Sequence, residues 1–229
     1  MNEHKDIDQI QKSIENELLS SGADIVGFAD VSDVEIGHEP KVQNAISIGI
    51  AYDPDIVQAL DTEVGEFERH LRDTKSQMDV LLKIFEQRLR QEGYAVWVPP
   101  ISKNLPGLVS DFSHKTAATK AGLGWVGKNA LFVSPEFGCG LRLATILTDA
   151  PLAVGIPVTK SRCGKCAECV KACSHEALKG ENWHPGIERD KLVDAFLCSE
   201  KRAEYIPILG YKHPCGLCIQ ACPVGKKRG

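Results

Sequence analysis

Apolar residues near the start of the chain recur every three or four positions, the spacing that places them on one face of an α-helix. The residues with this spacing are Ile7, Ile10, Ile14 and Leu18. Gly22 follows them, and glycine commonly ends a helix. The pattern predicts an amphipathic helix over residues 5–20.

A longer pattern of the same period covers residues 63–92. It places a group of large apolar side chains on or near one face: Phe67, Leu71, Met78, Leu81, Leu82, Phe85 and Leu89. Gly93 comes directly after it. This pattern predicts one long helix that packs against a core and ends at the glycine.

Short apolar runs between and after these helices predict strands. The runs are "ADIVGFAD", "AISIGIAY", "YAVWVPP", "NALFVSP" and "LRLATILTD". Ahead of the fourth run, Ser113 is placed to cap a short helix that continues through Lys120. Helices and strands are mixed without strict βαβ alternation, so the predicted fold class is α+β.

The charge and the cysteines are distributed unevenly. Residues 1–157 carry 14 Lys and Arg against 23 Asp and Glu, a net charge of −9, whereas residues 158–229 carry 13 against 8, a net charge of +5. Eight of the nine cysteines lie in the basic part. This shift, at the Gly- and Pro-containing stretch "VGIPVTKS", predicts a first domain over residues 1–157 and a second over residues 158–229.

The positive charge of the second part has three interpretations. It aids solubility, or it compensates the charge of cysteine-bound metal, or it docks an acidic partner. The amino-terminal "MNEHKDIDQIQKSIENELLSSG" carries a charge every few residues, and no apolar stretch approaches the length that spans a bilayer. We therefore expect a cytoplasmic protein that does not interact with membranes.

The stretch "AGLGWVGKN", residues 121–129, fits two phosphate-binding patterns. It contains G-x-G-x-x-G and most of the pattern G-x-x-x-x-G-K-[ST], with Asn129 in place of the final hydroxyl residue. Both kinds of loop leave a strand and enter a helix, because the phosphate lies on the helix amino terminus. Here a predicted helix precedes the glycines and a predicted strand follows them. The order disfavours a nucleotide, although glycines still let a backbone approach a flat, bulky ligand.

Seven cysteines form the spacing of a bacterial two-cluster ferredoxin. The motifs are C-x2-C-x2-C-x3-C at Cys163, Cys166, Cys169 and Cys173, and C-x2-C-x3-C-P at Cys215, Cys218 and Cys222. In such motifs the last cysteine starts a helix that points away, and it ligates the other cluster. The first 4Fe-4S cluster is therefore predicted at Cys163, Cys166, Cys169 and Cys222.

The second cluster then has three ligands in the motifs, and Cys198 is the natural fourth. Its predicted ligands are Cys173, Cys198, Cys215 and Cys218. Paired zinc sites and disulfides are the alternatives, but zinc usually takes two spaced pairs of ligands, and disulfides are not expected without an export signal. Cys139 is left over, and we interpret it as a small packed thiol.

The stretch "SHKTAATKAGLGWVGKNALFVSPEFG", the following "LTDAPL" and the eight-cysteine arrangement resemble epoxyqueuosine reductases and their relatives, which include the reductive dehalogenases. The resemblance is close over about residues 100–229 and looser before them. It implies a cobalamin held between a nitroreductase-like α/β domain and a ferredoxin-type domain, whose clusters pass electrons to the cobalt. Such low-potential clusters suit the formation of cob(I)alamin.

The resemblance also assigns the cofactor-binding residues. These are Ser113, Lys115, Gly122, Leu123, Gly124, Trp125, Gly127, Lys128 and Asn129. Base-off cobalamin is expected, since the chain lacks the D-x-H-x-x-G pattern that supplies a histidine to cobalt. The nitroreductase-like fold suggests flavin as a weaker alternative. The alternative to a corrin contact is that Trp125 is a core residue and that Lys128 is solvated.

Two departures from the family change the expected reaction. The family's catalytic aspartate has no counterpart at Leu108, so Asp111 and His114 are the candidate proton donors; both also suit a helix start. The chain ends seven residues after Cys222, without the helical-repeat region that helps bind tRNA. We therefore do not expect a tRNA substrate, and we interpret the basic "GKKRG" ending as a solvated tail rather than a nucleic-acid site.

Two classes of function remain. One is a cobalamin-dependent reductase of a small substrate that takes electrons from an external low-potential donor of the ferredoxin or flavodoxin type. The other is a ferredoxin-like electron carrier or reductive activator for a corrinoid or other partner protein. The loop "AGLGWVGKN" favours the enzyme, while the short chain and the missing acid favour the carrier.

Overall fold

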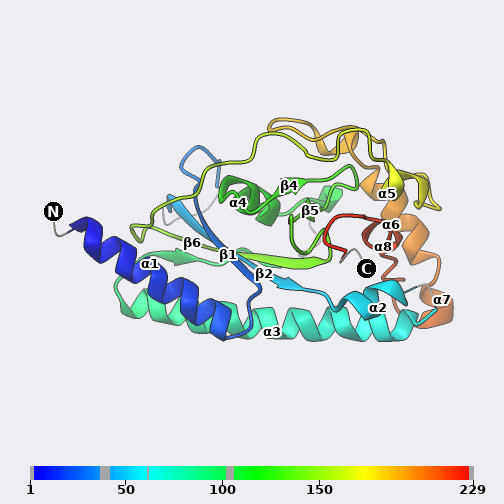
Figure 1. Ribbon diagram of the computed structural model, residues 1–229. Helices are drawn as coiled ribbons and strands as arrows, with labels where there is room; N and C mark the ends of the chain where they lie inside the picture. Colours follow the sequence, from blue (N-terminus) through cyan, green and yellow to red (C-terminus); the bar gives the residue numbers. More distant parts are fainter. Residues whose placement is uncertain (1–2, 37–41, 61, 102–105, 227–229) are drawn as a thin grey trace. The chain divides into compact units, whose positions relative to one another are not determined.

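The computed structural model describes residues 3–36, 42–60, 62–101 and 106–226 (Figure 1). The chain forms two compact units, each assembled from three separate stretches. The first unit comprises residues 1–51, 75–123 and 142–158, and the second comprises residues 52–74, 124–141 and 159–229. Residues 52–74 and 124–141, which the sequence prediction assigned to a first domain, thus group with the cysteine-rich part.

A four-stranded sheet forms the centre of the first unit, in the order β1-β2-β6-β3. Its strands are β1 (Ile25–Asp30), β2 (Asn44–Ala51), β6 (Leu141–Thr148) and β3 (Val96–Trp97). β1 pairs antiparallel with β2, Phe28 opposite Ile46, and β3 pairs antiparallel with β6. The β-branched runs predicted as strands form this sheet, although β3 is confined to two residues of "YAVWVPP".

Two helices cover one face of this sheet, α1 (Glu3–Ser20) and the part of α3 (Val64–Gln91) that belongs to the first unit (Figure 1). Their apolar stripes meet alternate residues of β2 in one core, which contains Ile14, Leu18, Ile46, Ile48, Met78, Leu82, Phe85 and Leu89. Each such side chain contributes roughly 1.5–3 kcal/mol when it leaves water. Both helices lie within two residues of their predicted bounds, and Gly93 follows α3 as expected.

The other face of the sheet packs against α4 (His114–Lys120) (Figure 1). Ala29, Ala45 and Leu147 face this side, together with Phe112 and Ala117. Small side chains on both surfaces let the helix approach the strands closely. The Ser113 side chain caps α4 by accepting a hydrogen bond from the Thr116 amide, as predicted.

The second unit is built from short elements. They are α2 (Pro54–Gln58), the start of α3, the hairpin β4 (Trp125–Val126) and β5 (Phe132–Val133), α5 (Glu168–Lys171), α6 (Ala195–Ala203), α7 (Ile206–Leu209) and α8 (Leu217–Gln220). Two single 3₁₀ turns complete the fold, Pro106–Leu108 in the first unit and Arg189–Lys191 in the second. A small core at Val57, Leu60 and Phe67 packs against Leu217 and Ile219 of α8.

The architecture is the mixed α/β class that the sequence predicts. Among the helices that the structure describes, none is both long enough and apolar enough to cross a bilayer.

Candidate functional site

The first cysteine set consists of Cys163, Cys166, Cys169 and Cys222, and the second of Cys173, Cys198, Cys215 and Cys218. Loops and helix ends of the second unit carry both sets: Cys169 lies in α5, Cys198 in α6 and Cys218 in α8. α5 packs beside α8, so the two sequence motifs meet although about fifty residues separate them. Cys173 and Cys222 each follow a short helix, which corrects the expectation that the last cysteine of a motif begins one.

The members of the first set lie close enough to affect one another's ionisation. The pKa of the Cys169 thiol is raised to about 11, first by burial and then by the nearby thiols of Cys163, Cys222 and Cys166. Cys222, from the second motif, thus lies with the three cysteines of the first motif.

The second set shows the same mutual influence. Burial makes the largest contribution to the pKa of the Cys218 thiol, which is raised to about 12. The thiols of Cys215 and Cys198 raise it next, and then those of Cys169, from the first set, and Cys173, from the second. Burial also raises the pKa of Cys198, with Arg202 opposing it and Cys215 and Cys173 adding to it. Cys198 therefore lies beside the cysteine motifs in space, even though it lies between them in sequence.

The cysteines form no disulfide bond with one another and no single-ion site in the part of the chain that the structure describes. All nine cysteines lie in the described residues, and none forms a disulfide. Nowhere in the described part of the chain are three Cys, His, Asp or Glu side chains arranged to hold one metal ion. Buried thiols that repel one another as thiolates need a cationic group between them. The ligands of a cubane bind four different irons and therefore lie further apart than the ligands of a single zinc.

Cys139 is buried, with 4% of its surface exposed, so its predicted burial is confirmed. Its thiol donates to the sulfur of Cys222, which raises the pKa of Cys139 and lowers that of Cys222 to about 6. The Asn129 side-chain amide donates to the Cys139 sulfur at 3.3 Å and to the Cys218 carbonyl at 3.3 Å. Cys139 is thus packed against the segment that carries ligands of both sets.

Helix α4 precedes the loop "AGLGWVGKN" and β5 follows it, as the sequence predicts. The loop also contains β4, which was not predicted and which pairs antiparallel with β5. The glycines therefore connect a helix to a strand, the reverse of a nucleotide-binding loop. Gly122 and Leu123 belong to the first unit and Gly124–Asn129 to the second.

The loop glycines are required by contacts within the protein. A Cβ atom at Gly124 would lie 2.1 Å from the Val133 carbonyl oxygen, and one at Gly127 would lie 2.7 Å from the Asn129 side-chain oxygen. Gly122 adopts a φ of +81°, a conformation that other residues rarely take, and it is the exposed one of the three. Gly122 is also closely packed, because a Cβ atom there would lie 2.8 Å from the Ile156 carbonyl oxygen. All three glycines thus serve close packing, and Gly122 is the exposed one.

Trp125 and Asn129 were predicted to line a corrin ring, and the structure gives both of them partners in the cysteine region. The Trp125 indole N–H donates to the Cys163 sulfur at 3.4 Å, and the Arg162 guanidinium lies 5.5 Å from the Trp125 ring centre. Hydrogen bonds to ligand sulfurs are one way in which a protein sets a cluster's reduction potential. Lys128, between them in sequence, is 8% exposed, which rules out a fully solvated side chain.

Three further predicted cofactor residues lie in the first unit. Ser113 uses its hydroxyl oxygen to cap α4, and Lys115 is half-buried in the first turn of that helix. Leu123 packs against the core beneath α4, where a Cβ at Gly27 would lie 2.9 Å from it. Leu123 thus contributes to packing, while Gly122 is the exposed position next to it.

The two candidate proton donors differ in environment. Asp111 is exposed on the turn before α4. Burial lowers the pKa of His114 to about 4, which the Pro100 backbone partly offsets, and its Nδ1 lies 3.0 Å from the Thr145 hydroxyl oxygen. At pH 7 the His114 ring is neutral, so it serves as a hydrogen-bonding group and not as an imidazolium acid. Leu108, the position of the family's aspartate, adopts a φ of +54°.

This neutral histidine predicts a pH-dependent stability. Between pH 6.5 and about 4 the unfolded chain binds a proton at His114 that the folded chain does not, so the free energy of unfolding falls as the pH falls through this window. The slope from this one group reaches at most about 1.4 kcal/mol per pH unit. In urea unfolding between about pH 7 and about pH 5.5, the His114→Gln variant should lose less stability than the parent. Equal losses of stability in the parent and in the His114→Gln variant would contradict the low pKa of His114.

Solved structures of known proteins share the fold of this chain. No family model matches the chain. Solved structures that share the mixed α/β fold are oxidoreductases of two kinds, epoxyqueuosine reductases and reductive dehalogenases. A selenomethionine-labelled epoxyqueuosine reductase superposes with a TM-score of 0.62 at 18% identity, covering 96% of this chain and 66% of that one. A reductive dehalogenase, described as B12-dependent, gives a TM-score of 0.67 at 16% identity, with 95% and 32% covered.

Curated sequences name the same family. The epoxyqueuosine reductase of a Synechocystis species is 28% identical over 192 residues, which is 80% of this chain and 63% of that protein. That of a Synechococcus species is 32% identical over 145 residues, covering 62% and 44%. The resemblance to epoxyqueuosine reductases and reductive dehalogenases is therefore confirmed. The chain spans only about half to two thirds of the length of these two relatives.

The sequence prediction missed several residues of the site region. Asn129 was assigned to the cofactor, but its hydrogen bonds to Cys139 and to the Cys218 carbonyl lie between residues far apart in sequence. Arg202, which faces Cys198, was not singled out. It lies four residues after the predicted ligand Cys198 in α6, which places both on the same helical face, but no helix was predicted there.

Proposed function

We propose that this chain is an iron–sulfur oxidoreductase in which two 4Fe-4S clusters pass electrons to a base-off cobalamin that reduces a substrate. The observation that carries the proposal is the cysteine spacing, together with the influence of neighbouring thiols, Cys198 among them, on one another's pKa. The similarity to epoxyqueuosine reductases and to a reductive dehalogenase described as B12-dependent supports the cobalamin.

The residues of the second unit fit the two clusters. Each set offers four thiols whose mutual repulsion a cationic cluster would relieve. The Trp125 N–H and the Cys139 thiol donate to sulfurs of the first set, and such hydrogen bonds stabilise the added electron. The first cluster would therefore be the more readily reduced of the two, which suits a relay from the second cluster to the first.

Cobalamin, when bound, supplies a strongly reducing and nucleophilic cobalt. We infer that Gly122 contacts it, because Gly122 is the exposed one of the predicted residues in the first unit. Trp125, Lys128 and Asn129 are buried in the second unit. Flavin remains the alternative cofactor. Asp111 and His114 stay the two candidate proton donors, the first exposed and the second buried and neutral at pH 7.

A second candidate function is a ferredoxin-like electron carrier or reductive activator of a corrinoid protein. The observation that favours it is the absence of an acid where the family has one. Leu108 occupies that position, and buried His114 is not protonated at pH 7. In this case the clusters would be present, and no cobalamin would be retained.

The substrate is either a small molecule or a modified tRNA. The sequence argument against tRNA depends on where the chain ends, and the end of this sequence does not decide the length of the protein. One structural neighbour, at a TM-score of 0.60 and 19% identity, is an epoxyqueuosine reductase bound to an epoxyqueuosine-modified tRNA stem loop. That stem loop is therefore a substrate to test first. Residues 227–229 of the basic ending lie outside the described residues.

The decisive experiment adds cobalamin to the anaerobic holoprotein, removes the excess by gel filtration and measures cobalt against iron. We expect about one cobalt per about eight irons, and a cob(II)alamin electron-spin spectrum without axial nitrogen coupling. Intact clusters without retained cobalt would favour the carrier. Zinc in place of iron would exclude both functions.

A further inference from the structure

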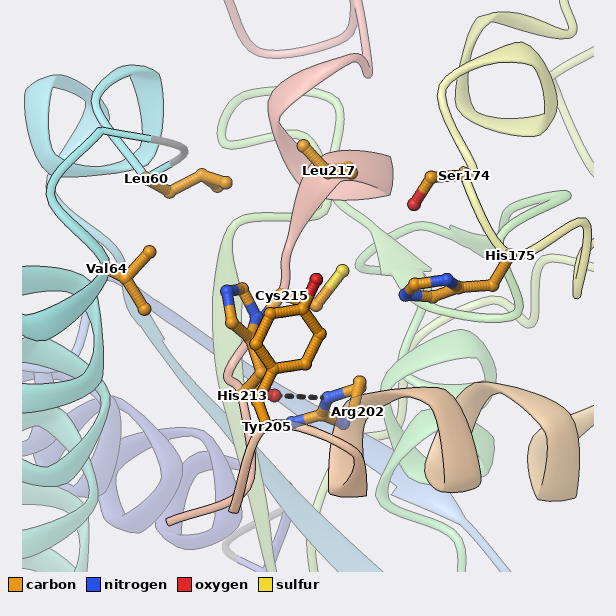
Figure 2. Close-up of a pocket in the computed structure, with 9 residues that line it drawn as sticks. All are labelled: Leu60, Val64, Ser174, His175, Arg202, Tyr205, His213, Cys215 and Leu217. Atoms are coloured by element: carbon orange, nitrogen blue, oxygen red, sulfur yellow. Dashed lines mark hydrogen bonds between the residues drawn. The ribbon is translucent and has the colours of Figure 1, made fainter. Parts of the chain in front are cut away.

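A pocket of about 190 Å³ lies beside the second cysteine set, within the second unit (Figure 2). The residues that matter for its chemistry are Ser174, His175, Arg202, Tyr205, His213 and Cys215. Cys215 is a predicted ligand of the second cluster, and the other three members of its set do not line the pocket. The pocket is therefore next to the cluster site and distinct from the space between the four thiols.

Hydrogen-bond donors surround this pocket. The His213 Nδ1 accepts from the Cys215 amide at 2.8 Å, which leaves the proton of a neutral ring on Nε2. Arg202 Nε donates to the His213 carbonyl at 2.6 Å, and this bond fixes the guanidinium at the pocket wall. In Figure 2 the His175 and His213 rings flank the Cys215 sulfur. None of the described residues that line the pocket is acidic, so its chemistry suits a carboxylate.

Two cations lie at or next to the pocket. Arg202 lines it, and Lys212, which directly precedes His213 in the chain, donates to the Ser199 hydroxyl. Residues 158–229 carry a net charge of +5, but residues 52–74, which share this unit, carry −5. The attraction for a carboxylate is therefore local and comes from Arg202, not from the net charge of the unit.

Exposed apolar side chains lie on the two helices next to the pocket. Phe196 of α6 is 57% exposed, and Ile206 and Ile208 of α7 are 46% and 79% exposed. Tyr205 connects the pocket to the exposed apolar residues of α7, because it lines the pocket and directly precedes α7. Apolar residues beside charged ones are typical of the small, transient interfaces of redox proteins.

We propose that the Arg202 pocket, together with Phe196, Ile206 and Ile208, is the docking site for an acidic electron-donor protein of the flavodoxin or ferredoxin type. A carboxylate of the donor enters the pocket, and apolar residues of the donor cover α7. One electron then passes from the reduced donor to the second cluster beside Cys215, so the donor is oxidised by one electron and the cluster is reduced by one. This inference rests on the proposed function, since it needs the second cluster.

Binding of an acidic flavodoxin to the reconstituted protein tests the proposal. Flavodoxin affinity is measured by calorimetry at low and high salt, and the rate of cluster reduction by flavodoxin hydroquinone is measured by stopped flow. The Arg202→Gln and Ile208→Glu variants should each weaken binding about tenfold at low salt, and Ile208→Glu should keep the parent's iron content. Arg202→Gln should also reduce the salt dependence. Lys179→Gln removes an exposed charge of the same basic part that does not line the pocket, and it should bind as the parent does.

The outcomes separate this inference from the proposed function. If Arg202→Gln loses iron, Ile208→Glu still decides, because its side chain is 79% exposed and contributes little to folding. Parent-like flavodoxin binding by Ile208→Glu, or no binding by an iron-replete parent, would overturn the docking site and leave the clusters and cobalamin standing. Phosphate that protects the parent from unfolding, without displacing flavodoxin, would identify a small-anion site instead and would also overturn it.

Discussion

The Cys198→Ala variant should contain about four irons per chain where the parent contains about eight. Cys198 lies with Cys173, Cys215 and Cys218, and without its thiol the second set has three ligands. The first set keeps all four. The remaining iron should therefore belong to a complete 4Fe-4S cluster, with labile sulfide falling in the same proportion. Iron and sulfide analysis of anaerobically reconstituted protein measures both.

Cys139→Ala is the matched control for that variant, because it removes a buried thiol that contacts the same segment without belonging to either set. It should retain about eight irons. Its first cluster should be harder to reduce, because the sulfur of Cys222 loses a hydrogen-bond donor. If Cys198→Ala kept eight irons and Cys139→Ala lost four, the ninth cysteine would take the place of Cys198 as a ligand.

Replacing Gly124 with valine should prevent the second unit from folding. The added Cβ would lie 2.1 Å from the Val133 carbonyl oxygen and 2.8 Å from the Phe132 ring, and a backbone atom has little room to move. The β4–β5 hairpin would have to open, at a cost of at least about 3 kcal/mol. Since Trp125 and Asn129 follow directly, their bonds to the cysteine region would be lost as well.

The measurement for Gly124→Val is the yield of soluble protein, its thermal midpoint and its iron content. Gly65→Ala is the control, because no atom lies within 4 Å of a Cβ at that position in α3. It should keep the parent's iron and thermal midpoint, or gain up to about 1 kcal/mol from helix propensity. A Gly124→Val protein with parent-like stability and iron that failed only to retain cobalamin would show instead that the glycine serves the cofactor.

Periodic patterns predicted the larger elements well. The three- and four-residue spacing located α1 and α3, since one face of each packs on the sheet and must be apolar. The strand runs located β1, β2 and β6, whose residues are buried on both faces. The two-residue strand β4 was not predicted, because so short a segment carries no readable period and forms only by pairing with β5.

The grouping of the site depended on different information. Cysteine spacing predicts ligands because a cluster imposes fixed distances along the chain, and the structure brings those residues together. The contacts of Trp125 with Cys163 and of Asn129 with Cys218 join residues 38 and 89 positions apart, and no local pattern encodes them. The glycines had a local signal, but their packing against Val133 depends on the hairpin that follows.

The interleaving of the two units has a consequence for how this protein is made. The chain passes from one unit to the other five times, so no single cut separates them. On the ribosome, residues 52–74 emerge long before the cysteines with which they will share a unit. The apolar side chains of Val57, Leu60 and Phe67 must wait for α8, which follows Phe67 by about 150 residues. Cluster assembly would therefore come only after α8 has been made, and a chain starved of iron would expose these side chains to chaperones and proteases.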